Sequence, residues 1–325
     1  MIESEHILKK VLITGGTGTF GKNLINFLLK KPIESITVFS RDEFKQHQMK
    51  MVYNTDKIKY IIGDIRDFDA LNNAFRDIDI VYHAAAIKHV KIAEDNPMEA
   101  IKTNILGTNN VIEAAIKNNV NKVIAVSTDK AVMPTNLYGS TKLCLEKLII
   151  NANKYSPTKF SVVRYGNVLC SRGSVVPIFL KLKDNNLAIK VTDMGATRFT
   201  ITIGDAIKFV TECAENAIGG EIFVPKLPSY SLQQLVQVIC PNREIIIIGL
   251  QKGEKMHEQM ICNSESSIII ENDNRYIICP EGNITKYYEL YGDSVCDSFN
   301  YTSDNNVLID NNVLKELISA NLDQC

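Results

Sequence analysis

The stretch "VLITGGTGTFGKNLINFLL" (residues 11–29) decides the fold. A short apolar run leads directly into Gly15, Gly18 and Gly21, and an amphipathic segment follows. The first glycine permits a tight turn, the second lets the backbone approach a pyrophosphate, and the third allows close packing of helix on strand. The helix N-terminus adds N–H groups and a partial positive charge. Glycines alone also fit ordinary turns, but the strand–turn–helix context predicts a dinucleotide-binding unit.

Further apolar runs of strand type follow, separated by segments of helical periodicity such as 97–119. The predicted strands lie at 9–14, 35–40, 58–63, 78–85, 121–127 and 160–166. Their apolar residues are continuous rather than alternating, which is typical of strands covered on both faces. Repeated strand–helix units of this kind predict an α/β fold with a Rossmann-type, doubly wound parallel sheet.

After about residue 170 the pattern loosens. A helix is predicted at 204–217, short strands at 221–225 and 243–249, and a last helix at 311–322. We therefore predict a dinucleotide-binding Rossmann domain over 1–170. The prediction allows residues 171–225 to contribute one further strand and one helix to this domain. A smaller α+β substrate-binding region is predicted over 171–325, with a divergent tail.

The composition narrows the functional class. The chain has 325 residues, with 36 Lys and Arg against 37 Asp and Glu, so it offers no electrostatic case for nucleic acid or an acidic membrane. No stretch approaches the roughly 20 apolar residues of a membrane span, and "MIESEHILKK" is acidic where a secretory signal is basic. The eight cysteines form no CxxC pair, which predicts no metal site and a reducing, cytoplasmic location.

The end of the second strand, "VFSRDEFKQ", bears on the choice of dinucleotide. NAD sites usually have an acidic residue there, on the ribose 2′-hydroxyl. Here Ser40 and Arg41 stand at the junction and Lys45 follows one turn on, so a hydroxyl and two cations favour the 2′-phosphate of NADP. The alternative is that Asp42 takes the ribose of NAD.

Other cofactor contacts are predicted after the next strands. Asp64 in "GDIRD" is expected to reach the adenine amino group, and the small residues Ala84 and Ala86 in "HAAA" let the backbone approach the cofactor. The remaining predicted cofactor contacts are Thr17, Thr19, Phe20, Ile65, Asn104 and Val168.

The segment "STDKAVMPTNLYGSTK" (127–142) carries the reactive side chains. Tyr138 and Lys142 share a helix face at spacing i, i+4, so the ammonium can lower the phenol pKa and help hold a nicotinamide ribose. A phenolate there is a general base for oxidising an alcohol. Asp129 and Lys130 place an acid beside a base. A solvated surface ion pair is the alternative, which their position between a strand and YxxxK disfavours.

Together with "HAAAIKHV", "TNILGT", "VVRYGNV", "SRGSVVP" and "GEKMHE", these motifs make residues 9–265 resemble the extended short-chain dehydrogenase/reductases. In detail the chain is similar to the inverting UDP-N-acetylglucosamine 4,6-dehydratases. Hexose dehydratases of the wider family have Thr-Asp-Glu where this chain has Thr128, Asp129 and Lys130. Long membrane-anchored relatives often lack the tyrosine that is Tyr138 here. The resemblance implies a UDP-sugar substrate and a tightly bound, recycled NADP.

The resemblance also implies a mechanism. Tyr138, assisted by Lys142 and Thr128, takes the C4 hydroxyl proton while hydride passes to NADP⁺. Lys130, if neutral, removes the C5 hydrogen, and Asp129, if protonated, donates to the departing C6 hydroxyl. Hydride then returns to C6, and C5 is protonated on the opposite face. Such neighbouring roles need environments that push the two pKa values toward each other.

Several residues are expected to contact the substrate. The resemblance implies that Lys88 does so. Asn167 follows the sixth strand, at the same crevice. Arginines are candidates for the diphosphate, because a guanidinium fork matches phosphate oxygens. Glu258 is expected to accept from the uridine ribose. The predicted substrate contacts are Lys88, Asn167, Arg172, Val176, Arg198 and Glu258. Structural roles are expected for His83, His89 and His257, and helices near 97–119 and 139–154 are expected to pair in a homodimer or larger assembly.

Two other readings remain open. A nucleotide-sugar 4-epimerase shares the fold and the Tyr/Lys pair, but it removes no water and needs no Asp-Lys pair. A dinucleotide-binding protein without catalysis is expected to have lost some of the five residues Thr128, Asp129, Lys130, Tyr138 and Lys142, and all five are present.

Overall fold

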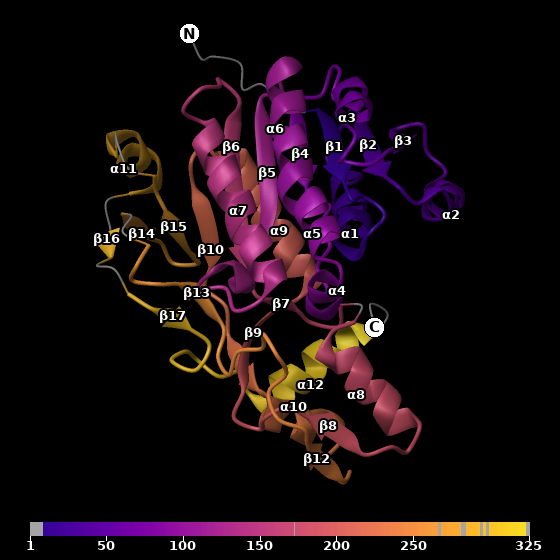
Figure 1. Ribbon diagram of the computed structural model, residues 1–325, viewed down its shortest axis with the longest axis vertical. Coiled ribbons are helices and arrows are strands. Elements are labelled where there is room, and N and C mark those ends of the chain that lie inside the picture. Colours follow the sequence, from indigo (N-terminus) through magenta and orange to yellow (C-terminus); the bar gives the residue numbers. More distant parts are fainter. Residues whose placement is uncertain are drawn as a thin grey trace.

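The computed structural model describes residues 9–171, 173–265, 268–280, 284–292, 295–296 and 299–322. Within these residues a ten-stranded sheet runs through the upper part of the molecule, in the order β16-β14-β15-β10-β6-β5-β4-β1-β2-β3 (Figure 1). A smaller region with short strands lies below it in this view. A cavity lined by residues of both parts lies between the two.

Seven strands of the large sheet are parallel. They are β3 (Ile58–Ile62), β2 (Ser35–Ser40), β1 (Lys10–Thr14), β4 (Ile80–His83), β5 (Lys122–Thr128), β6 (Lys159–Tyr165) and β10 (Ile222–Pro225). The chain crosses from one edge to the middle between β3 and β4, so the switch point lies between β1 and β4. Ligands of such sheets bind at the carboxyl ends of the strands there.

Continuous apolar strands are explained by cores on both faces. Val11 and Ile13 pack into one hydrophobic cluster and Leu12 into another, because successive side chains of a strand point to opposite faces. Helices α1 (Thr19–Leu28) and α9 (Ile203–Asn216) cover the first face. The second is covered by α3 (Phe68–Ala74), α6 (Gly107–Lys117) and α7 (Leu137–Ala152). The predicted doubly wound α/β fold is confirmed.

The helix predicted over 97–119 runs without a break from Pro97 to Lys117 but changes its winding in the middle. It consists of α5 (Pro97–Ile101), a π-helical turn η1 (Lys102–Leu106) and α6. The buried Asn104 lies in this turn and bonds to Ile87 and Thr141 outside it. The helical prediction for this segment is confirmed, but periodicity did not reveal the π-helical turn. Helices α2 (Glu43–Tyr53) and α4 (Val90–Asp95) complete the first half.

The smaller region packs around its own apolar cluster. Its three-stranded sheet has β9 (Thr197–Ile201) between β11 (Ser229–Ser231) and β7 (Asn167–Val168). The two-stranded sheet pairs β8 (Ile189–Val191) with β12 (Ile245–Ile247). Helices α8 (Val175–Asp184), α10 (Leu232–Ile239) and α12 (Asn311–Ala320) lie around them (Figure 1).

The later chain also contributes to the large sheet, beyond the predicted boundary at residue 170. Strand β10 and helix α9 are the strand and helix allowed for within 171–225. Three antiparallel strands at the edge were not expected: β15 (Arg275–Ile278), β14 (Ile269–Glu271) and β16 (Val295–Cys296). Helix α11 (Thr285–Tyr291) lies beside them, and β17 (Tyr301–Thr302) pairs with β13 (Gln259–Ile261). Among the described helices, none has the length and apolar character that crossing a membrane requires.

Candidate active site

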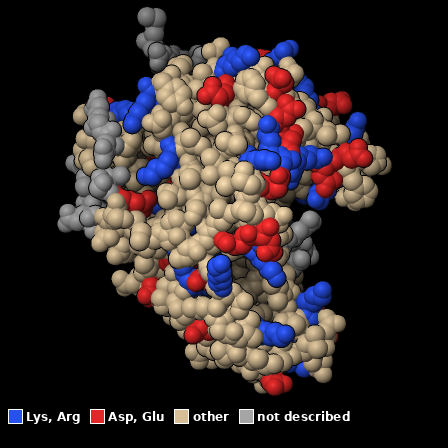
Figure 2. All heavy atoms as spheres, in the orientation of Figure 1, with Lys and Arg blue, Asp and Glu red and all other residues tan. Residues whose placement is uncertain are grey.

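A cavity of about 950 Å³ opens at the carboxyl ends of β1, β4, β5 and β6. Figure 2 shows a hollow between the upper and lower parts of the molecule, with acidic and basic side chains near its rim. From the large sheet it is lined by Thr19, Phe20, Ala84, Ala86, Lys88, Thr128, Lys130, Tyr138 and Lys142, and from the smaller region by Asn167, Val168, Arg198, Glu254 and Glu258. Thirteen of the predicted site residues therefore line one cavity.

The glycine turn between β1 and α1 has the geometry that a phosphate cradle needs. Gly15 has φ +68°, and a Cβ on it would lie 2.9 Å from the backbone of Ala85. Gly18 is the N-cap of α1 with no side chain to block the free N–H groups. A Cβ on Gly21 would lie 2.4 Å from the carbonyl oxygen of Gly16, so helix and strand pack closely. Thr17 in this turn is buried.

The end of β2 presents one well-exposed cation. The Arg41 side chain is 58% exposed and lies 3.8 Å from Asp64, whereas the Lys45 ammonium is held by Asp42 at 2.6 Å. Asp42 also caps α2 by accepting from the N–H of Lys45. The buried Ser40 hydroxyl accepts from Gln46 at 2.9 Å. Asp42 is thus already occupied by its own helix.

Two predicted cofactor contacts, Asp64 and Ile65, have other partners in the structure. Asp64 accepts from the Arg66 side chain at 2.8 and 2.6 Å, and although burial raises its pKa, these bonds hold that pKa below the usual range. The Ile65 side chain is buried and packs against Gly107. A contact from Ile65 to a cofactor would therefore use its backbone.

Two predicted ligand contacts have side chains that are engaged inside the protein. Asn104 uses its amide fully: Oδ1 accepts from the N–H of Ile87, and Nδ2 donates to the carbonyl of Ile87 and the hydroxyl of Thr141. It braces the loop after β4 against α7 instead of facing the cavity. Val176 is 1% exposed and belongs to the apolar core of the smaller region. Both were placed by sequence position, which does not reveal the direction of a side chain.

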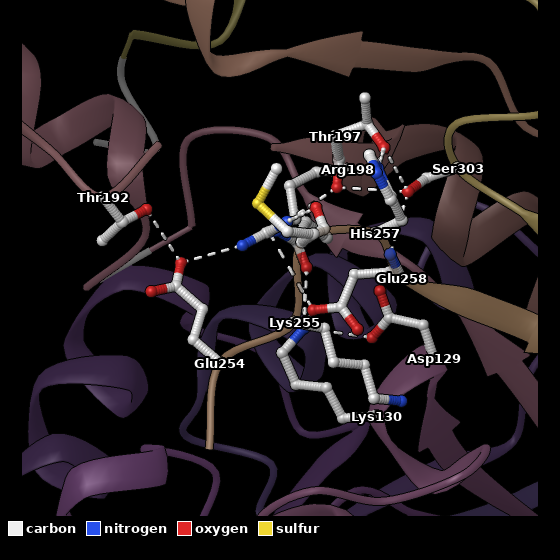
Figure 3. A network of polar contacts seen from close by, with 12 residues as sticks. Asp129, Lys130, Thr192, Thr197, Arg198, Glu254, Lys255, His257, Glu258 and Ser303 are labelled. Carbon is white, nitrogen blue, oxygen red and sulfur yellow. Dashed lines mark hydrogen bonds and ion pairs between the residues drawn. The ribbon is translucent and has the colours of Figure 1, made fainter. Parts of the chain in front are cut away.

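The reactive pair lies in a buried network (Figure 3). Asp129 is fully buried, and its Oδ1 accepts from Thr128 at 2.8 Å and from Lys130 at 3.1 Å. The Lys130 ammonium also lies 3.2 Å from Oδ1 of Asn167 and 2.9 Å from Oε1 of Glu258. A surface ion pair, the alternative for Asp129 and Lys130, is excluded by this burial.

The protonation of the pair is only partly the one expected. Burial raises the pKa of Asp129, and the carboxylate of Glu258 raises it further, as an acid needs. Burial lowers the pKa of Lys130, but Asp129 and Glu258 outweigh it and raise that pKa above its ordinary value. The ammonium is therefore the resting form of Lys130, and a base form requires that a proton leave it.

The predicted effect of Lys142 on Tyr138 is not the one found. Burial raises the pKa of Tyr138 to about 12, and the cation that opposes this is Lys130. The Lys142 ammonium instead donates to the carbonyl of Val126 at 2.7 Å, and burial lowers its pKa to about 8. Both side chains line the cavity, where a nicotinamide ribose would meet them.

A buried ion pair missed by the sequence analysis supports this helix from behind. Glu146, one turn after Lys142, accepts from Ser127 at 2.5 Å and from both Nε and Nη2 of Arg164. Arg164 also reaches Glu265 at 2.8 Å. The spacing of Glu146 from Lys142 was a usable signal, but no local pattern points to Arg164.

Arg198, a predicted substrate contact, already has partners within the protein. Arg198 donates to the carbonyls of Thr197 and Met256, and its Nη2 lies 2.8 Å from Glu254. Lys88 is exposed at the cavity. The predicted contact Arg172 lies outside the described residues. Within the part of the chain that the structure describes, no group of three or more His, Cys, Asp and Glu is arranged to hold a metal.

His83 and His257 have side-chain contacts of the structural kind expected of them, whereas the exposed His89 makes no side-chain capping bond and lines the cavity. His83 is fully buried between the hydroxyls of Thr14 and Thr108, at 2.8 and 3.0 Å. His257 lies 2.8 Å from the hydroxyl of Thr197, and His89 is the N-cap residue of α4.

Known proteins agree with this architecture. The family described as "Polysaccharide biosynthesis protein" matches residues 11–280. The chain belongs to this family. It is 47% identical over 312 residues to the UDP-N-acetylglucosamine 4,6-dehydratase (inverting) of Campylobacter jejuni, which covers 92% of this chain and 93% of the relative. It is 40% identical to the UDP-glucose 4-epimerase of Rickettsia bellii, over 97% of this chain and 96% of the relative.

The X-ray structure of Pen from Bacillus thuringiensis is similar to this member of the polysaccharide biosynthesis protein family over nearly all of both chains. The two are 39% identical, with a TM-score of 0.89 and coverage of 97% and 98%. The likeness extends past residue 265, where the sequence motifs end, so the later strands belong to the common fold.

Proposed function

We propose that this protein is a UDP-N-acetylglucosamine 4,6-dehydratase that inverts C5 and acts in the biosynthesis of deoxy-amino-sugar nucleotides. The observation that carries the proposal is the buried Asp129–Lys130 pair at the cavity that Tyr138 and Lys142 also face. Water elimination needs an acid and a base side by side, and oxidation of a sugar hydroxyl needs a Tyr/Lys pair. The similarity to the Campylobacter enzyme supports the same reaction.

The residues present fit a nicotinamide dinucleotide, and we propose NADP. The glycine turn leaves space that a Cβ at Gly15 would fill, and the free N-terminus of α1 suits a pyrophosphate. Arg41 would pair with a 2′-phosphate, and Lys142 would hold the nicotinamide ribose. Such a cofactor, when bound, accepts a hydride from sugar C4 and returns it to C6. NADP is favoured because Asp42 is already engaged by α2.

The proton steps belong to side chains of this chain. Tyr138 would take the C4 hydroxyl proton as a phenolate, which requires that its own phenol proton first leave to solvent through the cavity, because burial raises the pKa of Tyr138 to about 12. Asp129 and Lys130 reach the acid and base forms when one proton moves from Lys130 Nζ to Asp129 Oδ1 along their 3.1 Å hydrogen bond, with no change of net charge. Lys130 Nζ then takes the C5 proton, and Asp129 gives its proton to the C6 hydroxyl, which leaves as water.

The substrate would lie between the two parts of the molecule. We propose that Lys88 and Asn167 contact the sugar and that Arg198 and Arg172 contact the diphosphate, with Glu254 leaving Arg198 when the phosphates arrive. The Rossmann part would then bind the cofactor and the later part the uridine nucleotide. A homodimer or larger assembly is proposed from the resemblance.

A nucleotide-sugar 4-epimerase is the second candidate, because the Rickettsia relative has that name and matches nearly the whole chain. An epimerase returns the hydride to C4 and has no use for a buried acid–base pair beside the tyrosine. That pair favours the dehydratase.

The test is incubation of the purified protein with UDP-N-acetylglucosamine in D₂O without added cofactor, followed by NMR and mass spectrometry. Loss of one water, a C6 methyl signal and deuterium at an inverted C5 are expected. An unchanged sugar composition with an inverted C4 would instead support the epimerase. If the protein leaves UDP-N-acetylglucosamine unchanged, that result would count against this sugar as the substrate for either candidate function.

A further inference from the structure

One ammonium is surrounded by three oxygen acceptors from three separate segments. The three N–H groups of Lys130 are matched by Asp129 at 3.1 Å, Asn167 at 3.2 Å and Glu258 at 2.9 Å. Two of the acceptors are carboxylates, so they outnumber the cation. Oδ2 of Asp129 and Oε2 of Glu258 are buried and have no hydrogen-bond partner. Two unpartnered carboxylate oxygens beside one ammonium indicate a cluster built to retain a proton.

Glu258 is fixed in this place by the later chain. It is 3% exposed, its N–H donates to the hydroxyl of Ser303 at 2.9 Å, and its carbonyl accepts from the N–H of Ser303 at 2.8 Å. Ser303 is fully buried and also bonds to Thr197. Glu258, predicted as a ribose contact, thus lies in the same network as Lys130 (Figure 3).

The other charged and titratable groups around the cluster do not replace Glu258. Arg198 Nε lies 3.9 Å from Glu258, and Lys255 donates to the carbonyl of Val132. Tyr138 and Tyr230 face the cluster as neutral phenols with raised pKa values, mainly because of burial. Burial raises the pKa of Glu258, but Lys130 and Arg198 lower it below its ordinary value, so its charge is permanent near neutral pH.

We propose that Glu258 is a positioning residue of the elimination: its buried carboxylate holds Lys130 from the side opposite Asp129 and retains the proton that Asp129 and Lys130 share. This inference rests on the proposed dehydratase function. Because a fixed negative charge favours protonation of every neighbour, Glu258 keeps the pair from losing its last proton as the pH rises. The same charge delays the loss of the extra proton that the pair carries at low pH.

A positioning role for Glu258 predicts a shift of the pH profile in a definite direction, which a packing role does not predict. The pair works with one shared proton, so elimination rises and falls with pH as two protons are lost in turn. Removal of a carboxylate in contact with Lys130 should move both limbs of this profile to lower pH, by about one pH unit or more. A side chain that only filled space would lower the rate at every pH and leave both limbs in place.

The experiment compares wild type with Glu258→Gln and Glu258→Asp, and with Glu212→Gln as a matched control at an exposed carboxylate that pairs with Arg275. Single-turnover water loss is measured from pH 5 to 10, which covers the acid limb, because the raised pKa of Lys130 places the alkaline limb above this range. Cofactor reduction at 340 nm is the readout of the earlier Tyr138 step. We expect the acid limb to shift down in Glu258→Gln, to stay in Glu258→Asp and Glu212→Gln, and cofactor reduction to persist in all. An unshifted acid limb in Glu258→Gln would overturn the proposal.

A second readout separates this inference from the proposed function. The carboxyl carbon of Asp129, assigned by Asp129→Asn in protein labelled with ¹³C-aspartate, is titrated by NMR without substrate. Its midpoint should fall in Glu258→Gln and hold in Glu258→Asp. An unchanged midpoint in Glu258→Gln refutes the role of Glu258 even if the enzyme dehydrates its substrate. A lowered midpoint upholds the role even if the wild type removes no water and the proposed function fails.

Discussion

Arg164 on β6 and Glu146 on α7 form a buried, two-pronged ion pair directly behind the reactive segment. Nε and Nη2 of Arg164 lie 3.0 and 2.6 Å from the two oxygens of Glu146, and neither side chain is more than 2% exposed. Arg164 also donates to Glu265 and to the carbonyl of Met260. One guanidinium thus connects β6 with α7, which carries Tyr138 and Lys142, and with the segment around β13, which directly follows Glu258.

Replacement of this arginine should be costly. Arg164→Met leaves the buried Glu146 without its cation, and the expected loss in free energy of unfolding is about 3–5 kcal/mol. Urea denaturation measures it. Lys226→Met, which breaks the more exposed pair with Glu271, should cost at most about 1 kcal/mol. Equal losses in free energy of unfolding in the two variants would mean that the buried pair stabilises the protein no more than the exposed pair does.

Mutations should separate the oxidation at C4 from the elimination of water. Asp129→Asn and Lys130→Met remove the acid and the base of the elimination but leave Tyr138 and Lys142 in place. We expect water loss to slow by about 10²- to 10⁴-fold, while absorbance at 340 nm still rises when UDP-N-acetylglucosamine is added. Rapid-mixing absorbance and mass spectrometry follow the two steps.

Tyr138→Phe is the matched variant for that experiment, because it removes the phenol that takes the C4 proton and leaves the pair intact. It should abolish the rise at 340 nm together with water loss. Full dehydration by Lys130→Met would show that another group takes the C5 proton.

Much of the fold was predictable because its signals are local. The strand predicted at 35–40 has the same bounds as β2. A short run that is buried on both faces contains few polar residues, so its ends are easy to locate in the sequence. The segment at 97–119 was not predictable in detail. Its π-helical turn accompanies the bonds of Asn104 to Ile87 and Thr141, which periodicity does not encode.

The candidate site also has residues that local signals predict and residues that they do not. Asp129, Lys130, Tyr138 and Lys142 lie within fourteen residues of one another, so their convergence follows from one strand and one helix. The partners of these residues come from far along the chain. Glu258 meets Lys130 only because β9, β13 and Ser303 hold it there, and a contact of that separation has no signature in the sequence.

The choice of cofactor should depend on Arg41. Arg41→Ala is expected to lower the affinity for NADP relative to NAD by about tenfold or more, since a hydrogen bond to a charged group contributes about 1.5–3 kcal/mol. Fluorescence titration of cofactor-free protein with each dinucleotide measures the ratio. Lys45→Ala should change it less, because Asp42 already holds that ammonium at 2.6 Å. A preference for NAD in the wild type would contradict the assignment.

The stability of the protein should fall below neutral pH because of His83. Burial lowers the pKa of His83 to about 3, while an unfolded histidine titrates near 6.5. Between these values the unfolded chain binds a proton that the folded chain does not. Stability is therefore complete above about pH 6.5 and is lost as the pH falls toward 3. At pH 5 the expected loss from this one group is about 2 kcal/mol relative to pH 8.

His83→Asn removes the titrating ring while an amide can still bond to Thr14 or Thr108, which lie on either side of it. Urea denaturation at pH 5 and pH 8 should show a smaller pH dependence in this variant than in the wild type, whatever its absolute stability. His47→Gln, at an exposed histidine, should keep the wild-type dependence. An undiminished pH dependence in His83→Asn would mean that His83 is charged in the folded protein, and its contacts with the two hydroxyls would then require a different proton arrangement.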